Sequence, residues 1–343
     1  MFEPGWRFMR KLHSPTLALL CLLVILTAGA TVHVRLWQTD TRQDDIYYSW
    51  IEGGRIVNGE NPYARVLAGN MRDNDKYATY FPVFYELSAL TQWIGLHDYG
   101  SWIAFWRVVF LAFNLAIAAA LFILIYPRGR LIAAVFAAAF WLFNRWTLHV
   151  SQIAHLDFIP IFLLIASLGL FRKQRWASLL LFSVSLGIKQ ISIFLIPLYL
   201  VWTWQAAGRD RVRQTLLALG IIASVPVLAS LPFLIWNAEG FTKSLLFSVT
   251  RIPMDHFGTI SFDGMMGWSG LPGKLPLLAL VLLVSALTWH RKIGPYTGTL
   301  FIMAIFVDYN AVLFPQYLAW VVPFIPLVMC DLWDAAEGKV ASQ

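Results

Sequence analysis

The sequence predicts an all-α integral membrane protein. Hydrophobic residues make up 59% of the chain and charged residues 13%, about half of the ~25% that is usual in soluble domains. The apolar residues form long continuous runs, such as residues 216–236, and a helix of about 20 such residues crosses a bilayer. A transmembrane β-barrel would show short alternating segments instead. The 343 residues accommodate a single polytopic domain of about ten spans.

The positions of the basic residues orient these spans, because short cytoplasmic loops are rich in Lys and Arg. If the N-terminal cluster of Arg7, Arg10 and Lys11 is cytoplasmic, alternating spans place every short basic cluster on that side, and both termini are cytoplasmic. The predicted spans, in order, cover residues 15–36, 101–126, 131–149, 157–171, 176–188, 191–204, 216–236, 274–290, 295–309 and 312–330.

Two long segments then lie on the outer side, residues 37–100 and residues 237–273. In the first, residues 44–58 have helical spacing with one apolar face, which predicts an amphipathic helix lying on the membrane. Residues 81–96 are apolar but short and carry Glu86, so they predict a second interfacial helix. If residues 81–96 crossed the membrane instead, every later loop would be inverted and the later basic clusters would lie outside.

An acidic pair, Asp44 and Asp45, opens the first predicted interfacial helix. Carboxylates at a helix N-terminus interact favourably with the helix dipole, so capping is one explanation of the pair. A carboxylate that acts as a general base is the other. Spacing alone leaves both explanations open.

Several short motifs agree with a known group of enzymes. The first outer loop contains Asp44–Tyr48 (DDIYY), Gly59–Tyr63 (GENPY) and Tyr77–Pro82 (YATYFP), and later segments contain Ser151–Asp157, Gly187–Gln190 and Pro315–Trp320. Together they resemble the GT-C fold membrane glycosyltransferases, and most closely the polyprenyl-phosphate-mannose-dependent mannosyltransferases. One departure is Phe81 before Pro82, where that family usually has two prolines.

This resemblance implies an inverting transfer of a hexose, in the closest group mannose, from a polyprenyl phosphate to a glycolipid or glycan acceptor on the extracytoplasmic face. A carboxylate takes the proton of the attacking hydroxyl. Asp44 matches the family's base, and Asp45 is the close alternative. Cationic side chains are expected to stabilise the leaving phosphate, and the candidates are Lys189, Arg251 and His256.

The candidate residues for contacts with the sugar and the acceptor are Tyr48, Gln152, His155, Asp157, Gln190, Gln316 and Tyr317. Each assignment has a structural alternative. Lys189, at the tip of an outer hairpin, is a functional candidate as a charge at the membrane, or it extends its ammonium to the interface. His155 and Asp157 are explained equally by local capping, and Arg251 and His256 by an ordinary solvated loop.

Other classes of function have weaker support. The sequence contains no zinc-type cluster, phosphate loop or dinucleotide motif, so we expect no metal, no cofactor and no nucleic-acid partner. A transporter or lipid flippase is the alternative, in which polar residues in the spans would mark a pathway, namely Arg107, Asn114, Arg145 and Lys189. The inverted repeats of transporters are not evident. An enzyme that transfers another group from a lipid donor is a third possibility. The compact loops favour a bacterial plasma membrane over an endoplasmic reticulum membrane.

Overall fold

The computed structural model describes residues 14–42, 44–69, 77–128, 130–250 and 261–336. Most of these residues are helical, and none of them forms a β-strand. The predicted all-α fold class is therefore confirmed.

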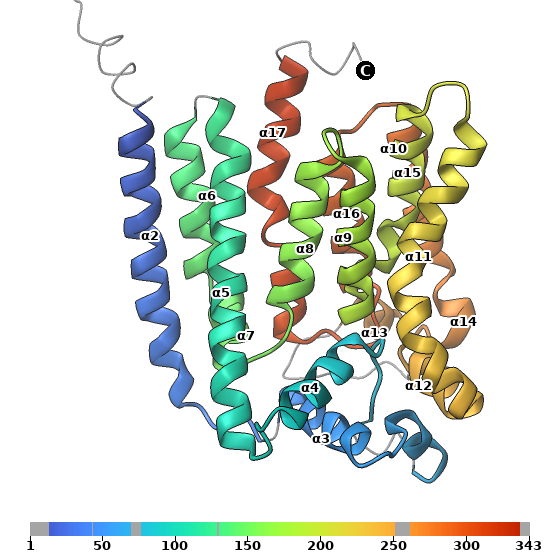
Figure 1. The fold of residues 1–343 in the computed structure, drawn as a ribbon. Coiled ribbons are helices and arrows are strands. Elements are labelled where there is room, and N and C mark those ends of the chain that lie inside the picture. The colour runs from blue at the N-terminus through green and yellow to red at the C-terminus, as the bar shows by residue number, and fades with distance from the viewer. Residues whose placement is uncertain (1–13, 43, 70–76, 129, 251–260, 337–343) are drawn as a thin grey trace, which may run out of the picture.

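Apolar helices run side by side and form the body of the molecule (Figure 1). They are α2 (Pro15–Arg35), α5 (Tyr99–Ile125), α6 (Leu131–Phe143), α7 (Arg145–Gln152), α8 (Phe158–Leu170), α9 (Arg175–Ile188), α10 (Ile196–Ala206), α11 (Arg211–Trp236), α15 (Leu275–Trp289), α16 (Pro295–Asp308) and α17 (Phe324–Ala336). Short 3-10 helices precede or follow several of them, namely η1 (Leu36–Gln38), η4 (Tyr126–Arg128), η5 (Gln190–Leu195) and η6 (Pro315–Trp320).

The lengths of these helices support a multi-pass membrane protein. In the described part of the chain, five helical segments are long and apolar enough to cross a membrane, and the bent pair α6–α7 makes up to six. Shorter apolar segments at α8, α9, η5–α10 and α16 occupy further predicted spans. The count of ten spans stays a prediction.

The span predicted at residues 131–149 is broken rather than continuous. Helices α6 and α7 meet at Asn144 with a bend of 44°. The side-chain oxygen of Asn144 accepts hydrogen bonds from the backbone N–H groups of Trp146 and Thr147, both at 3.0 Å. An N-cap of this kind starts a new helix, which explains why the apolar run does not continue straight.

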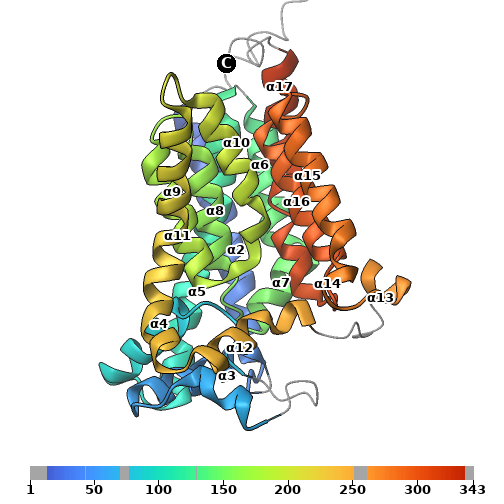
Figure 2. The same cartoon turned by 90° about the vertical axis from the view of Figure 1, so that its right-hand side faces the viewer.

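A second group of helices lies across one end of the bundle in both ribbon views (Figures 1 and 2). It comprises α3 (Asp45–Val57), η2 (Pro62–Leu67), α4 (Val83–Trp93) and α12 (Ala238–Thr250). We call this end the loop face, and the end where α2 begins and α17 ends the terminal face. Helices α3 and α4 occur where the two interfacial helices were expected. Their position on a membrane surface stays a prediction.

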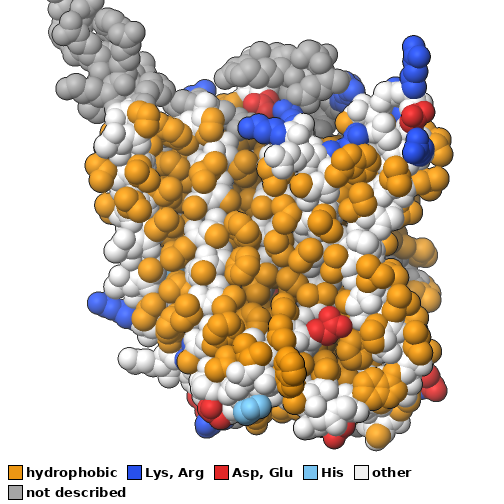
Figure 3. Space-filling view, in the orientation of Figure 1, with side chains coloured by type: hydrophobic (Ala, Val, Ile, Leu, Met, Phe, Trp, Pro, Cys, Tyr) orange, Lys and Arg blue, Asp and Glu red, His pale blue; other side chains and the backbone are white. Residues whose placement is uncertain are grey.

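Hydrophobic side chains cover the middle of the molecule, and charged side chains gather mainly towards its two ends (Figure 3). Ile132 and Ile235 are 72% and 83% exposed, whereas Trp102 and Trp141 are fully buried. Apolar residues both inside and outside are typical of helices surrounded by lipid. The bundle therefore presents the loop face and the terminal face as its two polar ends.

Candidate functional site

The most deeply buried charge near the loop face is the carboxylate of Asp157, which has no exposed surface. Asp157 is the N-cap residue of α8. The ammonium of Lys189 lies 2.5 Å from its Oδ1, and the indole N–H of Trp320 donates to its Oδ2 at 2.7 Å. A buried ion pair is stable only when such additional hydrogen bonds complete it. The ends of α8, α9 and η6 are therefore joined at one carboxylate.

Lys189 is enclosed rather than open to the membrane surface, since it is only 3% exposed. It ends α9 with an extended backbone, and its ammonium lies over the rings of Tyr80 at 4.7 Å and Trp320 at 5.1 Å from their centroids. Both are cation–π distances. In this arrangement Lys189 acts as the counter-ion of Asp157. Its role as a phosphate ligand stays a prediction.

His155 lies in the turn between α7 and α8, between two carboxylates. Its Nδ1 is 3.1 Å from Asp157 Oδ1, and its Nε2 is 3.4 Å from Asp45 Oδ2. Burial lowers the pKa of His155, but the carboxylate of Asp157 and the hydrogen bonds to both aspartates outweigh burial, so the net pKa is raised above 6.5. Two neighbouring carboxylates favour the charged imidazolium over the neutral ring.

The turn that carries His155 has an unusual backbone. Ala154 has a φ of 50° and is almost completely buried. This left-handed conformation is uncommon for a residue with a Cβ and persists where surrounding contacts impose it. The local strain accompanies the inward placement of His155.

Asp45 connects this buried cluster to the surface. Its side chain is 38% exposed, and the hydroxyl of Tyr80 donates to its Oδ2 at 3.4 Å. Its neighbour Asp44 is the N-cap residue of α3 but makes no side-chain capping bond, and its charge acts on Tyr99 on the α5 side. Of the acidic pair, Asp45 is therefore the carboxylate that joins the cluster.

Aromatic rings and amides surround the cluster. Tyr317 stacks on Trp320 with 4.2 Å between ring centroids, and Gln316 beside it is buried. The side-chain N–H of Gln190 donates to the backbone oxygen of Thr79 at 2.7 Å, next to Tyr80. Gln190, Gln316 and Tyr317 therefore lie beside residues of the cluster, and their contacts with sugar or acceptor stay predictions.

Four further candidates remain, Tyr48, Gln152, Arg251 and His256. Tyr48 packs edge-on against Tyr47, with 5.9 Å between ring centroids. Gln152 is exposed at the end of α7. Arg251 and His256 lie outside the described residues, and their predicted contact with the donor phosphate stays a prediction.

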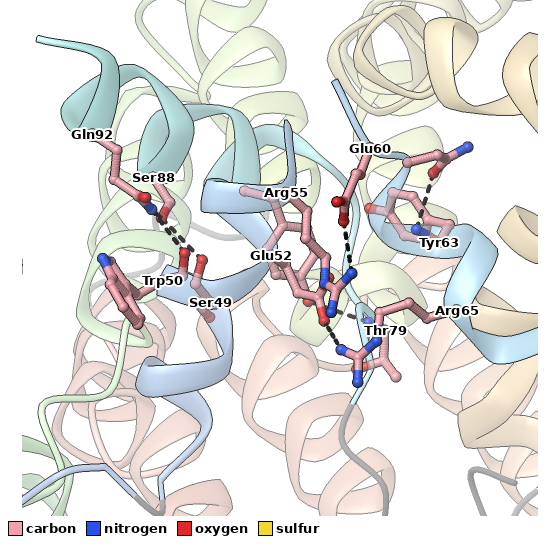
Figure 4. A network of polar contacts seen from close by, with 12 residues as sticks. Ser49, Trp50, Glu52, Arg55, Glu60, Tyr63, Arg65, Thr79, Ser88 and Gln92 are labelled. Atoms are coloured by element: carbon pink, nitrogen blue, oxygen red, sulfur yellow. Dashed lines mark hydrogen bonds and ion pairs between the residues drawn. The ribbon is translucent and has the colours of Figure 1, made fainter. Parts of the chain in front are cut away.

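Sequence reasoning omitted Tyr80 and Trp320 from the candidate residues, although both lie in motifs that it singled out. It also omitted Glu52, which is buried next to Arg65 and Arg55 (Figure 4). Burial raises the pKa of Glu52, while the two guanidinium groups oppose that rise. Glu52 follows Asp45 by seven positions, which is two turns along one face of a helix. This spacing was the available signal.

Helix α3 is held against α4 by close backbone contact (Figure 4). Ser88 Oγ donates to the backbone oxygen of Ser49 at 2.9 Å, and Gln92 Nε2 donates to that of Trp50 at 2.7 Å. A Cβ at Gly53 would lie 2.3 Å from Ser88 Oγ. The approach of the two helices therefore requires glycine at position 53, and it fixes the helix that carries Asp45.

Among the described residues, no group of three or more His, Cys, Asp or Glu side chains is placed to hold a metal ion. The carboxylates of Asp45 and Asp157 are separated by the imidazole of His155. The predictions of no metal and no cofactor stay predictions.

Two comparisons with known proteins bear on this site. No protein-family model matches the chain. The chain is similar to GPI mannosyltransferase 1 of Saccharomyces cerevisiae, with 22% identity over 338 residues that cover 88% of this chain and 79% of the relative. The two proteins are distant homologues along most of their length.

Proposed function

We propose that this protein is an inverting membrane glycosyltransferase, which moves mannose from a polyprenyl-phosphate donor to a glycolipid or glycan acceptor on the outer side of the membrane. The cluster of Asp45, His155, Asp157 and Lys189 carries the proposal. It combines one partly exposed carboxylate, that of Asp45, with the buried side chains of His155, Asp157 and Lys189 at one end of an apolar bundle. Perturbed ionisable groups of this kind gather at catalytic sites.

In the proposed reaction, an acceptor hydroxyl attacks the anomeric carbon of the donor sugar. The new glycosidic bond forms as the bond from that carbon to the phosphate oxygen breaks, and both electrons of the broken bond leave with the polyprenyl phosphate. The hydroxyl proton passes to the carboxylate of Asp45, which acts as general base. Asp44 remains the alternative base, since the resemblance of the first loop matches it.

His155 positions the base in this scheme. Its Nε2 lies 3.4 Å from Asp45 Oδ2, and Asp157 with Lys189 fixes the other side of the ring. The orientation of the Asp45 carboxylate therefore depends on the imidazole. Negative charge that develops on the leaving phosphate needs cations, for which Lys189, Arg251 and His256 remain the candidates.

The similarity to the yeast protein supports mannose as the transferred sugar and a glycolipid as the acceptor. Its name describes a mannosyltransferase that acts on GPI, a glycolipid, which agrees with mannose as the transferred sugar and a glycolipid as the acceptor. The polyprenyl-phosphate donor, the bacterial plasma membrane and the cytoplasmic termini rest on the sequence motifs and charge pattern alone. The apolar bundle supports a lipid-linked substrate, because the reactive phosphate of such a donor stays at the membrane surface.

The transporter alternative has less support. The guanidinium of Arg107 donates to the backbone oxygens of Trp37 and Thr39, the latter at 2.7 Å, and Asn114 Oδ1 accepts from the indole of Trp141 at 2.7 Å. These polar groups bind neighbouring helices, as structural groups do in membranes. None of these contacts favours transport.

One assay tests the proposal. Purified protein is incubated with polyprenyl-phosphate mannose and a membrane lipid extract, and release of polyprenyl phosphate and mannosylated lipid is measured. We expect both products in equal amounts, and neither with the Asp45→Asn variant. Polyprenyl-phosphate glucose in parallel tests the sugar. If polyprenyl phosphate is released only from the glucose donor, the assignment of mannose is wrong. If it is released from no lipid-linked donor, the protein is not the proposed glycosyltransferase.

A further inference from the structure

A large groove opens at the terminal face, at the opposite end of the bundle from the charged cluster. It has a volume of about 990 Å³ and is lined by the end of α10, the connection to α11 and the first turns of α11. A volume in this range accommodates a ligand of several hundred daltons. The groove is therefore large enough for part of a lipid molecule.

The walls of the groove are mainly apolar and continue along the outside of the bundle. Trp204, Leu216, Leu217 and Ile221 supply apolar side chains. Leu216 and Leu217 are 63% and 49% exposed, on a helix long and apolar enough to span the membrane. An acyl chain is the ordinary neighbour of such a surface.

Glycine at position 220 keeps the groove open. Gly220 lines it, and a Cβ placed there would meet no atom within 4 Å. Glycine inside a helix is destabilising relative to alanine, and close packing within the protein does not require it at this position. The space beside Gly220 is available to a ligand.

The rim of the groove is basic. Arg209, Arg211 and Arg213 line it, together with the single acid Asp210. The three arginines are exposed, and none of them forms an ion pair with a carboxylate of the described residues. Figure 3 shows basic side chains at the upper right, above the end of α11. Basic pockets beside membrane helices bind anionic lipid headgroups.

We propose that this groove binds an anionic phospholipid, with an acyl chain along Leu217, Gly220 and Ile221 and the phosphate at Arg209, Arg211 and Arg213. The arrangement matches the two parts of such a lipid, since the apolar walls face the hydrocarbon and the arginines lie at the level of the headgroups. This site is separate from the transfer reaction at the loop face.

The test uses Trp204 as a reporter, because it lines the groove. Purified full-length protein in detergent is titrated with phosphatidylglycerol that carries brominated acyl chains, and quenching of tryptophan fluorescence is recorded. The Trp204→Phe variant identifies the share of quenching due to Trp204. We expect saturable quenching of that share by brominated phosphatidylglycerol, and at least tenfold weaker binding of brominated phosphatidylcholine.

Variants separate the two halves of the groove. Because each basic residue near a membrane surface contributes about fivefold to the binding of anionic lipid, replacing all three arginines with glutamine should weaken binding roughly a hundredfold. The variant Gly220→Leu should abolish the Trp204 quenching by occupying the chain site. The control is the double variant Lys173→Gln/Lys292→Gln. It replaces two exposed lysines in other connections at the terminal face, and it should bind the lipid as the wild type does.

Three results would overturn the proposal: equal quenching by both lipids, unchanged binding in the triple arginine variant, or equal weakening in the lysine control. Thermal unfolding of each variant identifies any that fails to fold. If Gly220→Leu does not fold, the arginine variant alone decides the outcome. None of these measurements involves sugar transfer, so the result is independent of the proposed function.

Discussion

Asp45 and His155 are 110 positions apart in the chain, and their side chains lie 3.4 Å from each other. The contact connects α3 on the loop face to the turn that joins α7 and α8. On its other side His155 contacts Asp157, which Lys189 and Trp320 hold. The half-exposed carboxylate of Asp45 is therefore positioned by a series of buried charged side chains, and its orientation depends on each contact in that series.

The first prediction separates the two acids. Asp45→Asn should lower the rate of sugar transfer about 10²–10⁴-fold, the usual contribution of a general base, because an amide does not accept the hydroxyl proton. Asp44→Asn should lower it much less, since the charge of Asp44 acts on Tyr99 on the α5 side, whereas Asp45 contacts His155. Initial rates with saturating donor give the comparison. A larger loss in Asp44→Asn would assign the base to Asp44 instead.

The second prediction concerns the buried ion pair. Removing one partner leaves an uncompensated charge, so Asp157→Asn and Lys189→Met should each lower the free energy of unfolding by about 3–5 kcal/mol. The double variant should lose clearly less than the two single losses added together. Unfolding in mixed micelles with increasing denaturing detergent measures each value. Additive losses would show that the 2.5 Å contact contributes little.

The third prediction is a dependence of stability on pH. The pKa of His155 is raised in the folded protein, so its stabilising effect is complete below pH 6.5 and is lost as the pH rises through the folded-state pKa. The difference in melting temperature between the wild type and His155→Gln should therefore be largest near pH 6 and shrink towards pH 9. The control is His97→Gln at an exposed site. A difference that grows with pH would contradict protonated His155.

The sequence patterns predicted the positions of the helices along the chain better than the side-chain contacts that bend or join them. Long apolar runs gave α2, α5 and α11 within a few residues, because composition alone determines which segments remain in lipid. The break at Asn144 was missed, since it depends on a side chain that caps a new helix within the predicted span. The polar residues Asn144, Arg145 and His149 in that span were the visible signals.

The candidate site shows the same limit. Helical spacing and motif resemblance identified Asp45, His155, Asp157 and Lys189, which the fold brings together. The pairing of Lys189 with Asp157 was not predicted, because it joins the ends of two helices across 32 positions. Trp320 was missed for the same reason, since its hydrogen bond to Asp157 spans 163 positions. Contacts between residues so far apart in the sequence depend on tertiary packing, and the pattern of a single sequence does not indicate them.

The fourth prediction tests whether the position of α3 matters for activity. Gly53→Ala places a methyl group 2.3 Å from Ser88 Oγ and 2.9 Å from the backbone nitrogen of Ala89. Overpacking of this kind costs about 1–3 kcal/mol, and it should shift α3 and lower sugar transfer. Gly208→Ala is the control, because a Cβ at that exposed position meets nothing within 4 Å. Equal stability and activity in both variants would show that the α3–α4 contact is adaptable.

The fifth prediction tests the orientation of the bundle. Asn58 is exposed on the loop face and Lys292 is exposed after α15, at the terminal face. The background should first lack Cys21 and Cys330, which are half-buried and buried. A maleimide that does not cross membranes should label Asn58→Cys in intact cells, and Lys292→Cys only after the membrane is opened, because the basic clusters face the cytoplasm. The reverse pattern would place the acidic site inside the cell. Labelling of both positions from outside would mean that the two faces are not separated by the membrane, and the predicted order of spans would be wrong.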